Sequence, residues 1–177
     1  MPAARPRAWP LLRGGSAVLR QVASLARPRV ILADDHVDVI KTFQKFLEND
    51  CDVVATVSDG RSLVESALRL VPDIIITDIS MPVLDGLEAL RQLKQLGVPS
   101  KVIVLTMHSD PQLAVKALTI GADGYVLKLS ARGEMLKAIA DVSRGLTYIS
   151  PQIRDQLPRE YVDRSVPAEH SCDKERR

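Results

Sequence analysis

The chain has 177 residues, 46% hydrophobic and 26% charged, which is enough for one buried core but short for two full domains. No apolar run approaches the roughly 20 residues of a membrane-spanning helix, which argues against membrane insertion. Cys51 and Cys172 lie far apart without a CxxC motif, which argues against a disulfide framework and a zinc site. A reducing compartment, the cytoplasm, is therefore favoured. The net charge is +2, but residues 30–150 hold 12 basic and 16 acidic residues, which argues against a nucleic-acid-binding core.

The first segment, residues 1–28, is an arginine-rich leader. Residues 1–29 hold six arginines and no acidic residue, and the only apolar stretch of the leader, around Ala17 to Ala26, is interrupted by Arg20. That interruption makes it a poor secretory signal, whereas an arginine-rich, acid-free composition also suits an organelle transit peptide. We expect a disordered extension or a wrongly chosen start codon, with the transit peptide as the alternative.

From Arg29 onward, short β-branched runs alternate with stretches of helical periodicity, which is typical of βαβ units around a parallel sheet. We therefore expect an α/β protein whose doubly wound parallel sheet has five strands, in one domain over residues 29–148. The predicted strands are Arg29 to Ala33, Asp52 to Val57, Asp73 to Thr77, Lys101 to Thr106 and Gly124 to Leu127. The predicted helices are His36 to Asn49, Gly60 to Leu70, Leu87 to Leu96, Pro111 to Ile120 and Ala131 to Arg144.

The predicted helices each show one apolar face, as expected of helices that cover a sheet. In the first, five apolar residues recur at spacings of three and four, and lysines and a glutamate remain for the solvent side. The apolar residues are Val37, Ile40, Phe43, Phe46 and Leu47.

The pattern ends near residue 149. Three prolines and mixed charges follow, so residues 149–177 are expected to form a mostly disordered tail, with one helical turn around Gln152 to Gln156.

Polar residues follow the predicted strands at their carboxyl ends, where open parallel sheets bind ligands. Asp34 and Asp35 follow the first strand, Asp78 follows the third, Thr106 ends the fourth and Lys128 follows the fifth. Crowded carboxylates repel each other unless a cation compensates them, and oxygen ligands without histidine or thiolate favour Mg²⁺ over zinc. The expected site therefore suits phosphoryl transfer with one carboxylate as the nucleophile.

Four sequence runs at these positions resemble the receiver domain of bacterial two-component response regulators. The similarity spans about residues 28–146 and implies a flavodoxin-like sheet with strand order 2-1-3-4-5. The runs are Val30-Ile-Leu-Ala-Asp-Asp-His36, Ile76-Thr-Asp-Ile-Ser-Met-Pro-Val-Leu-Asp-Gly86, Val104-Leu-Thr-Met-His108 and Gly121-Ala-Asp-Gly-Tyr-Val-Leu-Lys128.

The resemblance implies a role for each site residue. Asp78 would accept a phosphoryl group from a sensor histidine kinase or a small donor, so the protein would be a regulatory phosphoacceptor and not a conventional enzyme. Asp35 and Asp78 would bind Mg²⁺ directly, with the Ser80 backbone carbonyl as a third ligand and Asp34 acting through water. Lys128 would pair with the phosphoryl oxygens.

The resemblance also implies a switch. Thr106 would move toward the phosphoryl group while the Tyr125 ring turns inward, which would change the surface of helix four, strand five and helix five for partners, including a second copy of the chain. Ser80 and His108 would tune the access of hydrolytic water. His36 and His108 are both expected to face solvent.

The chain departs from most receivers after Lys128, where Leu129 and Ser130 replace the usual proline. These residues are similar to the NarL/LuxR subgroup, in which a helix-turn-helix output domain follows, yet the residues after Pro151 lack its helical pattern. The main expectation is a receiver acting through protein contacts, either stand-alone or a truncated LuxR-type transcription regulator, and direct DNA binding is not expected. A magnesium-dependent phosphatase of the haloacid-dehalogenase kind is disfavoured, because Ser80 replaces its second aspartate.

Overall fold

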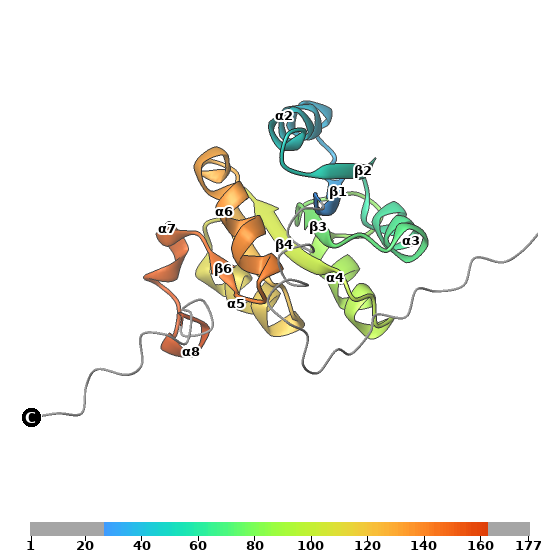
Figure 1. The fold of residues 1–177 in the computed structure, drawn as a ribbon. Coiled ribbons are helices and arrows are strands. Elements are labelled where there is room, and N and C mark those ends of the chain that lie inside the picture. The colour runs from blue at the N-terminus through green and yellow to red at the C-terminus, as the bar shows by residue number, and fades with distance from the viewer. Residues whose placement is uncertain (1–26, 163–177) are drawn as a thin grey trace, which may run out of the picture.

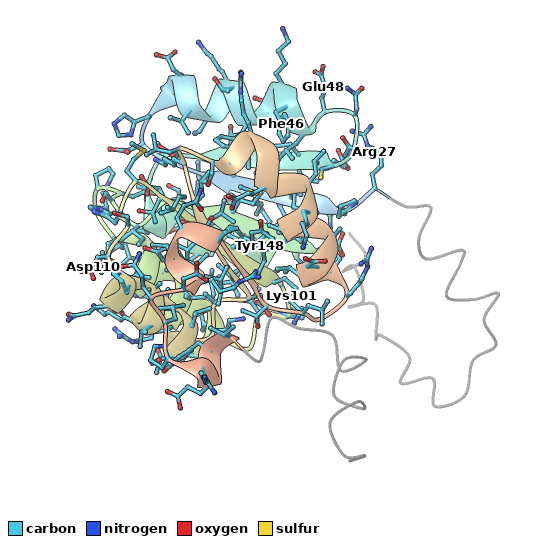
Figure 2. The ribbon with its side chains drawn as sticks, turned by 90° about the vertical axis from the view of Figure 1, so that its left-hand side faces the viewer. Arg27, Phe46, Glu48, Lys101, Asp110 and Tyr148 are labelled. Atoms are coloured by element: carbon cyan, nitrogen blue, oxygen red, sulfur yellow. The ribbon has the colours of Figure 1, made fainter. Side chains whose placement is uncertain are left out.

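The computed structural model describes residues 27–162, and residues 1–26 and 163–177 lie outside this range. Most of the expected disordered leader and the last part of the expected tail therefore fall outside the described residues. At the start of the range, the Arg27 guanidinium donates hydrogen bonds to the backbone carbonyls of Glu48 and Cys51 (Figure 2). These bonds hold the beginning of the domain against the end of its first described helix.

The described residues form a parallel sheet of six strands, where five were expected. The order is β2-β1-β3-β4-β5-β6, so the expected order 2-1-3-4-5 is correct and β6 extends it by one strand beside β5. The strands are β1 (Arg29–Ala33), β2 (Asp52–Val57), β3 (Ile74–Thr77), β4 (Lys101–Thr106), β5 (Gly124–Leu127) and β6 (Tyr148–Ile149).

Helices lie on both faces of this sheet (Figure 1). The first to fifth predicted helices correspond to α2 to α6, so the expected switch surface consists of α5, β5 and α6. Within residues 27–162, no helix combines the length and apolar content that crossing a membrane requires. The helices are α2 (Val37–Leu47), α3 (Gly60–Leu70), α4 (Gly86–Gln95), α5 (Pro111–Ile120), α6 (Ala131–Ser143), α7 (Pro151–Arg154) and α8 (Arg159–Val162).

Side chains of successive strand residues point to opposite faces of the sheet, so they pack into two separate hydrophobic cores, one on each face. Ile31 and Val104 pack with the helices α3, α4 and α5, whereas Leu32 and Leu105 pack with α2 and α6. The burial of both faces explains why the central strands are continuously apolar. In α2, Phe43 and Leu47 are buried as expected, but the Val37 side chain is 59% exposed because it begins the helix at the rim of the sheet.

Residues 149–162 belong to the packed domain, which differs from the expected disordered tail. Ile153 on α7 and Leu157 after it are buried in the core that α3, α4 and α5 cover. The hydroxyls of Tyr161 on α8 and Thr119 on α5 lie 3.0 Å apart. The helical turn expected at residues 152–156 is present as α7, which begins one residue earlier, at Pro151, and ends at Arg154. These contacts place the C-terminal segment against α5, where it covers part of the expected switch surface.

Candidate functional site

The strand register brings the predicted site residues to one rim of the sheet. The Asp78 backbone N–H donates to the carbonyl of Ala33 at 2.8 Å, which aligns the end of β3 with the end of β1. The Lys128 N–H donates to the carbonyl of Thr106 at 2.8 Å, which aligns β5 with β4 in the same way. The residues that follow β1, β3 and β5 are thus neighbours, as the strand-end pattern predicts.

Lys128 forms the centre of this cluster. Its Nζ lies 2.6 Å from Asp34 Oδ2 and 2.7 Å from Asp78 Oδ2, and both aspartate side chains are only 5% exposed. Burial by itself would lower the pKa of the Lys128 ammonium, but the hydrogen bonds and negative charges of the two aspartates outweigh burial and raise this pKa above its usual 10.5. Lys128 therefore stays positively charged at neutral pH.

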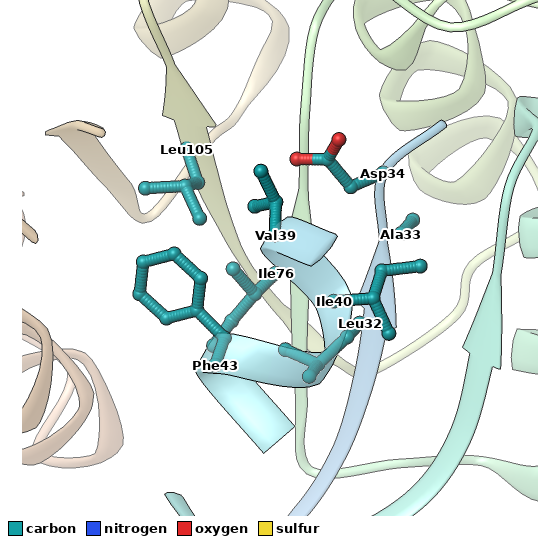
Figure 3. A pocket seen from close by; sticks show the side chains of 8 residues that line it. All are labelled: Leu32, Ala33, Asp34, Val39, Ile40, Phe43, Ile76 and Leu105. Atoms are coloured by element: carbon teal, nitrogen blue, oxygen red, sulfur yellow. The ribbon is translucent and has the colours of Figure 1, made fainter. Parts of the chain in front are cut away.

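An apolar wall lies beside Asp34 (Figure 3). Asp34 is the only charged side chain that lines this small pocket between α2 and the sheet. Apolar side chains surround this side of Asp34, so the local dielectric constant is low and the attraction between Asp34 and Lys128 is stronger than it would be at an open surface. The apolar lining residues are Leu32, Ala33, Val39, Ile40, Phe43, Ile76 and Leu105.

Asp78 is held in a fixed orientation. While Oδ2 contacts Lys128, Oδ1 accepts a hydrogen bond from the Ile79 N–H at 2.7 Å. The following loop supports this arrangement, because the Asp85 side chain caps α4 by accepting from the Glu88 N–H at 2.8 Å.

Asp35 and His36 complete the acidic cluster on its exposed side. The His36 side chain is 66% exposed, as expected, but its Nδ1 lies 2.7 Å from Asp35 Oδ1 and 3.2 Å from Asp34 Oδ1. One ligand atom from each of Asp34, Asp35, His36 and Asp78 lies within 4.8 Å of the others. The structure thus adds His36 to the three predicted carboxylates.

The donor set fits a hard divalent cation. Asp34 Oδ2 is buried and, apart from the ion-pair contact with Lys128, has no hydrogen-bond partner. Three carboxylates face a single lysine ammonium here, which leaves excess negative charge in a confined space. Carboxylate oxygens in such an arrangement can hold Mg²⁺, which prefers oxygen ligands and a small number of protein contacts.

Adding Mg²⁺ should stabilise the fold, because a cation that binds only the native state relieves the repulsion among these carboxylates. At a concentration ten times its Kd, the free energy of unfolding should rise by about 1.4 kcal/mol. Urea unfolding followed by circular dichroism with and without Mg²⁺ measures this. Asp35→Asn should remove most of the gain, whereas Asp52→Asn, at an exposed position at the opposite end of the sheet, should keep it. An equal gain in both variants would contradict the site.

Thr106 and Tyr125 are linked through the backbone of His108. The Thr106 hydroxyl oxygen accepts from the His108 N–H at 3.1 Å, and the Tyr125 hydroxyl donates to the His108 carbonyl at 2.9 Å. Both side chains are fully buried, and burial, with smaller contributions from nearby aspartates, raises the pKa of Tyr125 to about 12. The Tyr125 ring is therefore inward, and the Thr106 hydroxyl engages this loop and not Asp78.

The loops after β3 and β4 also meet through side chains. Ser80 Oγ lies 3.1 Å from Nε2 of His108, which is exposed as expected. The residue types alone did not predict this contact or the backbone link through His108, because both depend on the path of the β4–α5 loop. The resemblance had already placed Ser80 and His108 near the site, and each stands two residues beyond a predicted site residue.

Comparison with known proteins gives an independent indication of the family. The family model described as the response regulator receiver domain matches residues 30–140. The oxygen regulatory protein NreC of Staphylococcus carnosus is 33% identical over 138 residues, which cover 76% of this chain and 64% of that protein. The transcriptional regulatory protein DegU of Brevibacillus brevis is 35% identical over 135 residues, which cover 75% of this chain and 57% of that protein. The chain thus spans less than two thirds of either relative.

Solved structures agree with the sequence comparisons. A LuxR-family two-component response regulator from Aurantimonas is 31% identical with a TM-score of 0.72, and the match covers 77% of this chain and 99% of that one. The isolated receiver domain of RcsB from Salmonella enterica, solved with the phosphomimetic BeF₃⁻, is 30% identical with a TM-score of 0.69, covering 75% and 100%. The chain therefore belongs to the response regulator receiver domain family of two-component signalling proteins.

Proposed function

We propose that Asp78 is the residue that accepts the phosphoryl group, from a sensor histidine kinase or from a small phosphodonor. The observation that carries this proposal is the contact of the fixed Asp78 carboxylate with Lys128. An Asp78 oxygen forms a bond to phosphorus while the bond from phosphorus to the donor's imidazole nitrogen breaks, and the imidazole takes up a proton. The product is an acyl phosphate on Asp78.

The other cluster residues neutralise charge during this transfer. Lys128, whose raised pKa keeps it protonated, moves toward the phosphoryl oxygens as they approach. Asp35 and Asp78 would hold Mg²⁺ directly, with the Ser80 carbonyl as a further ligand and Asp34 acting through water. When bound, this ion neutralises phosphoryl oxygens in the transition state.

The switch is proposed to work through the loop that carries His108. A phosphoryl group on Asp78 offers a new acceptor to the Thr106 hydroxyl, which now accepts from the His108 N–H. The hydroxyl can accept from the His108 N–H and donate to the phosphoryl group at once, so it is movement of Thr106 toward the phosphoryl group that breaks the bond to His108. The loop is then freed at this point, and its other anchor is Tyr125. Phosphorylation thereby shifts the population of two arrangements of α5 and β5 and changes the surface that partners contact.

We also propose where a second copy of the chain would bind. The edge of β5 is paired with β6, and Tyr161 on α8 contacts Thr119 on α5. A second copy that binds at the α5–β5–α6 surface would therefore contact α5 and α6 and not the edge of β5. The related protein RcsB has been solved as two dimers bound to two parallel DNAs. For the present chain we propose instead an output through contacts with other proteins.

The phosphatase alternative receives no support. The position two residues after Asp78, where such enzymes need an acid/base aspartate, is Ser80, and its hydroxyl contacts His108. The chain also belongs to the receiver family by sequence.

Incubation with acetyl phosphate and Mg²⁺ tests the proposed function. We expect one phosphoryl group per chain by intact mass spectrometry, located in the peptide that contains Asp78, released by hydroxylamine as an acyl phosphate is, and absent when EDTA removes the metal. Failure to label the folded protein with both acetyl phosphate and a phosphorylated histidine kinase would overturn the proposal, as would a label on another residue.

A further inference from the structure

A buried serine holds the end of β5 next to the site. Ser150 is fully buried, and its Oγ accepts a hydrogen bond from the Leu127 N–H at 3.0 Å and donates one to Glu134 Oε2 at 2.5 Å. The Ser150 hydroxyl thus both accepts a hydrogen bond from β5 and donates one to α6. Its partner on β5, Leu127, is the residue before Lys128, whose ammonium pairs with Asp78.

The usual reason for a serine at this position does not apply. Ser150 precedes Pro151 at the start of α7, where a serine hydroxyl normally accepts from an N–H of the first helical turn. The Ser150 side chain makes no such capping bond, and its backbone N–H donates to the Tyr125 carbonyl at 2.9 Å. Backbone and side chain of Ser150 both hold β5, the strand that carries Tyr125 and leads to Lys128.

The end of β5 is therefore held from two sides. On one side the Lys128 N–H donates to the Thr106 carbonyl of β4 at 2.8 Å, and on the other Leu127 donates to Ser150. Removing the Ser150 hydroxyl would leave a buried N–H without an acceptor, so the end of the strand would have to move to find one. Lys128 would move with it.

We propose that Ser150 is a positioning residue for Lys128, and that it couples the site to the segment of β6, α7 and α8. This inference rests on the proposed function. Beyond Ser150, Ile153 and Leu157 are buried in the same core as Tyr125, and α8 contacts α5 through Tyr161. A change at Lys128 is thereby transmitted to residues 151–162, and by thermodynamic reciprocity a change in that segment alters the affinity of the site for a phosphoryl group.

Binding of Mg²⁺ and then of beryllofluoride, a phosphoryl mimic, tests the positioning role. In Ser150→Ala we expect beryllofluoride affinity to fall about fivefold, as for one lost hydrogen bond, because the mimic contacts Lys128. Mg²⁺ affinity should not fall, because the Lys128 ammonium competes with the cation for Asp34 and Asp78 and does not bind the cation itself. General loosening of the fold would weaken both ligands alike. The matched control is Ser143→Ala, which removes a hydroxyl that donates to the Ile139 carbonyl at 2.7 Å on α6 and should change neither affinity.

A second pair of variants keeps the test valid if Ser150→Ala does not fold. Glu134→Gln retains an acceptor for the Ser150 hydroxyl and should bind beryllofluoride as the unaltered protein does, whereas Glu134→Ala should weaken it. Beryllofluoride should also change amide hydrogen exchange in residues 151–162 of the unaltered protein but not of Ser150→Ala. If the unaltered protein does not bind beryllofluoride, the proposed function is wrong; if it binds but Ser150→Ala matches Ser143→Ala, only the positioning role is wrong.

Discussion

Asp78→Asn should abolish phosphorylation by acetyl phosphate and by a histidine kinase while leaving the fold intact. The amide has nearly the same shape as the carboxylate, and its oxygen can still accept from the Ile79 N–H. It is neutral, however, and a much weaker nucleophile toward phosphorus. Lys128 would keep its ion pair with Asp34 but lose the one with Asp78. Removal of one of three crowded carboxylates offsets this loss, so the free energy of unfolding should change by no more than about 1 kcal/mol.

The control for this variant is another aspartate paired with lysine. Asp123 lies at the opposite end of the sheet, with Lys94 at 3.3 Å and Lys101 at 2.9 Å. Asp123→Asn should be labelled as efficiently as the unaltered protein, as measured by intact mass and by radioactive phosphate. Persistent labelling of folded Asp78→Asn would disprove the assignment of the phosphoryl acceptor.

Gly86→Ala should be the most destabilising single-methyl change near the site. A Cβ at position 86 would lie 1.8 Å from the backbone oxygen of Asp78 and 2.9 Å from its carbonyl carbon, so the start of α4 or the end of β3 must shift. Both are buried backbone segments, and we expect a loss of about 3 kcal/mol or more in the free energy of unfolding. Because the shift moves Asp78, labelling of the folded fraction should also become slower.

Gly133→Ala is the matched control. Gly133 lies on α6, and an added Cβ would meet no atom within 4 Å. Replacing glycine with alanine in an open helical position should stabilise the protein by up to about 1 kcal/mol. Urea denaturation followed by circular dichroism compares the two variants. Similar transition midpoints for Gly86→Ala and Gly133→Ala would show that the close approach of α4 to Asp78 is wrong.

The strands β1, β3, β4 and β5 were predictable because parallel strands between two helical layers must be apolar nearly throughout, and this pattern is local. The partly exposed edge strand β2 was recognised instead by its short β-branched run. β6 was missed because two residues are too few to show alternation. A signal for the segment after it was nevertheless present. Ile149, Ile153, Leu157 and Tyr161 recur at intervals of four, and all lie in or against the core that α3, α4 and α5 cover. Prolines and mixed charges concealed this spacing.

The site was largely predictable for a different reason. The carboxyl ends of neighbouring parallel strands must meet, so Asp34, Asp78 and Lys128 could be placed together once their strands were known. Contacts made by loops do not follow from such a rule. The approach of His36 to Asp35 depends on how α2 begins, and those contacts became visible only in three dimensions.

The Lys128 ammonium forms ion pairs with two carboxylates at once, because it lies 2.6 Å from Asp34 and 2.7 Å from Asp78. If Asp78 became an acyl phosphate, the added anion would draw this ammonium away from Asp34. The Asp34 carboxylate would then attract a divalent cation more strongly. Esterification of Asp78 and cation binding would thus be cooperative, and each should favour the other by the same factor.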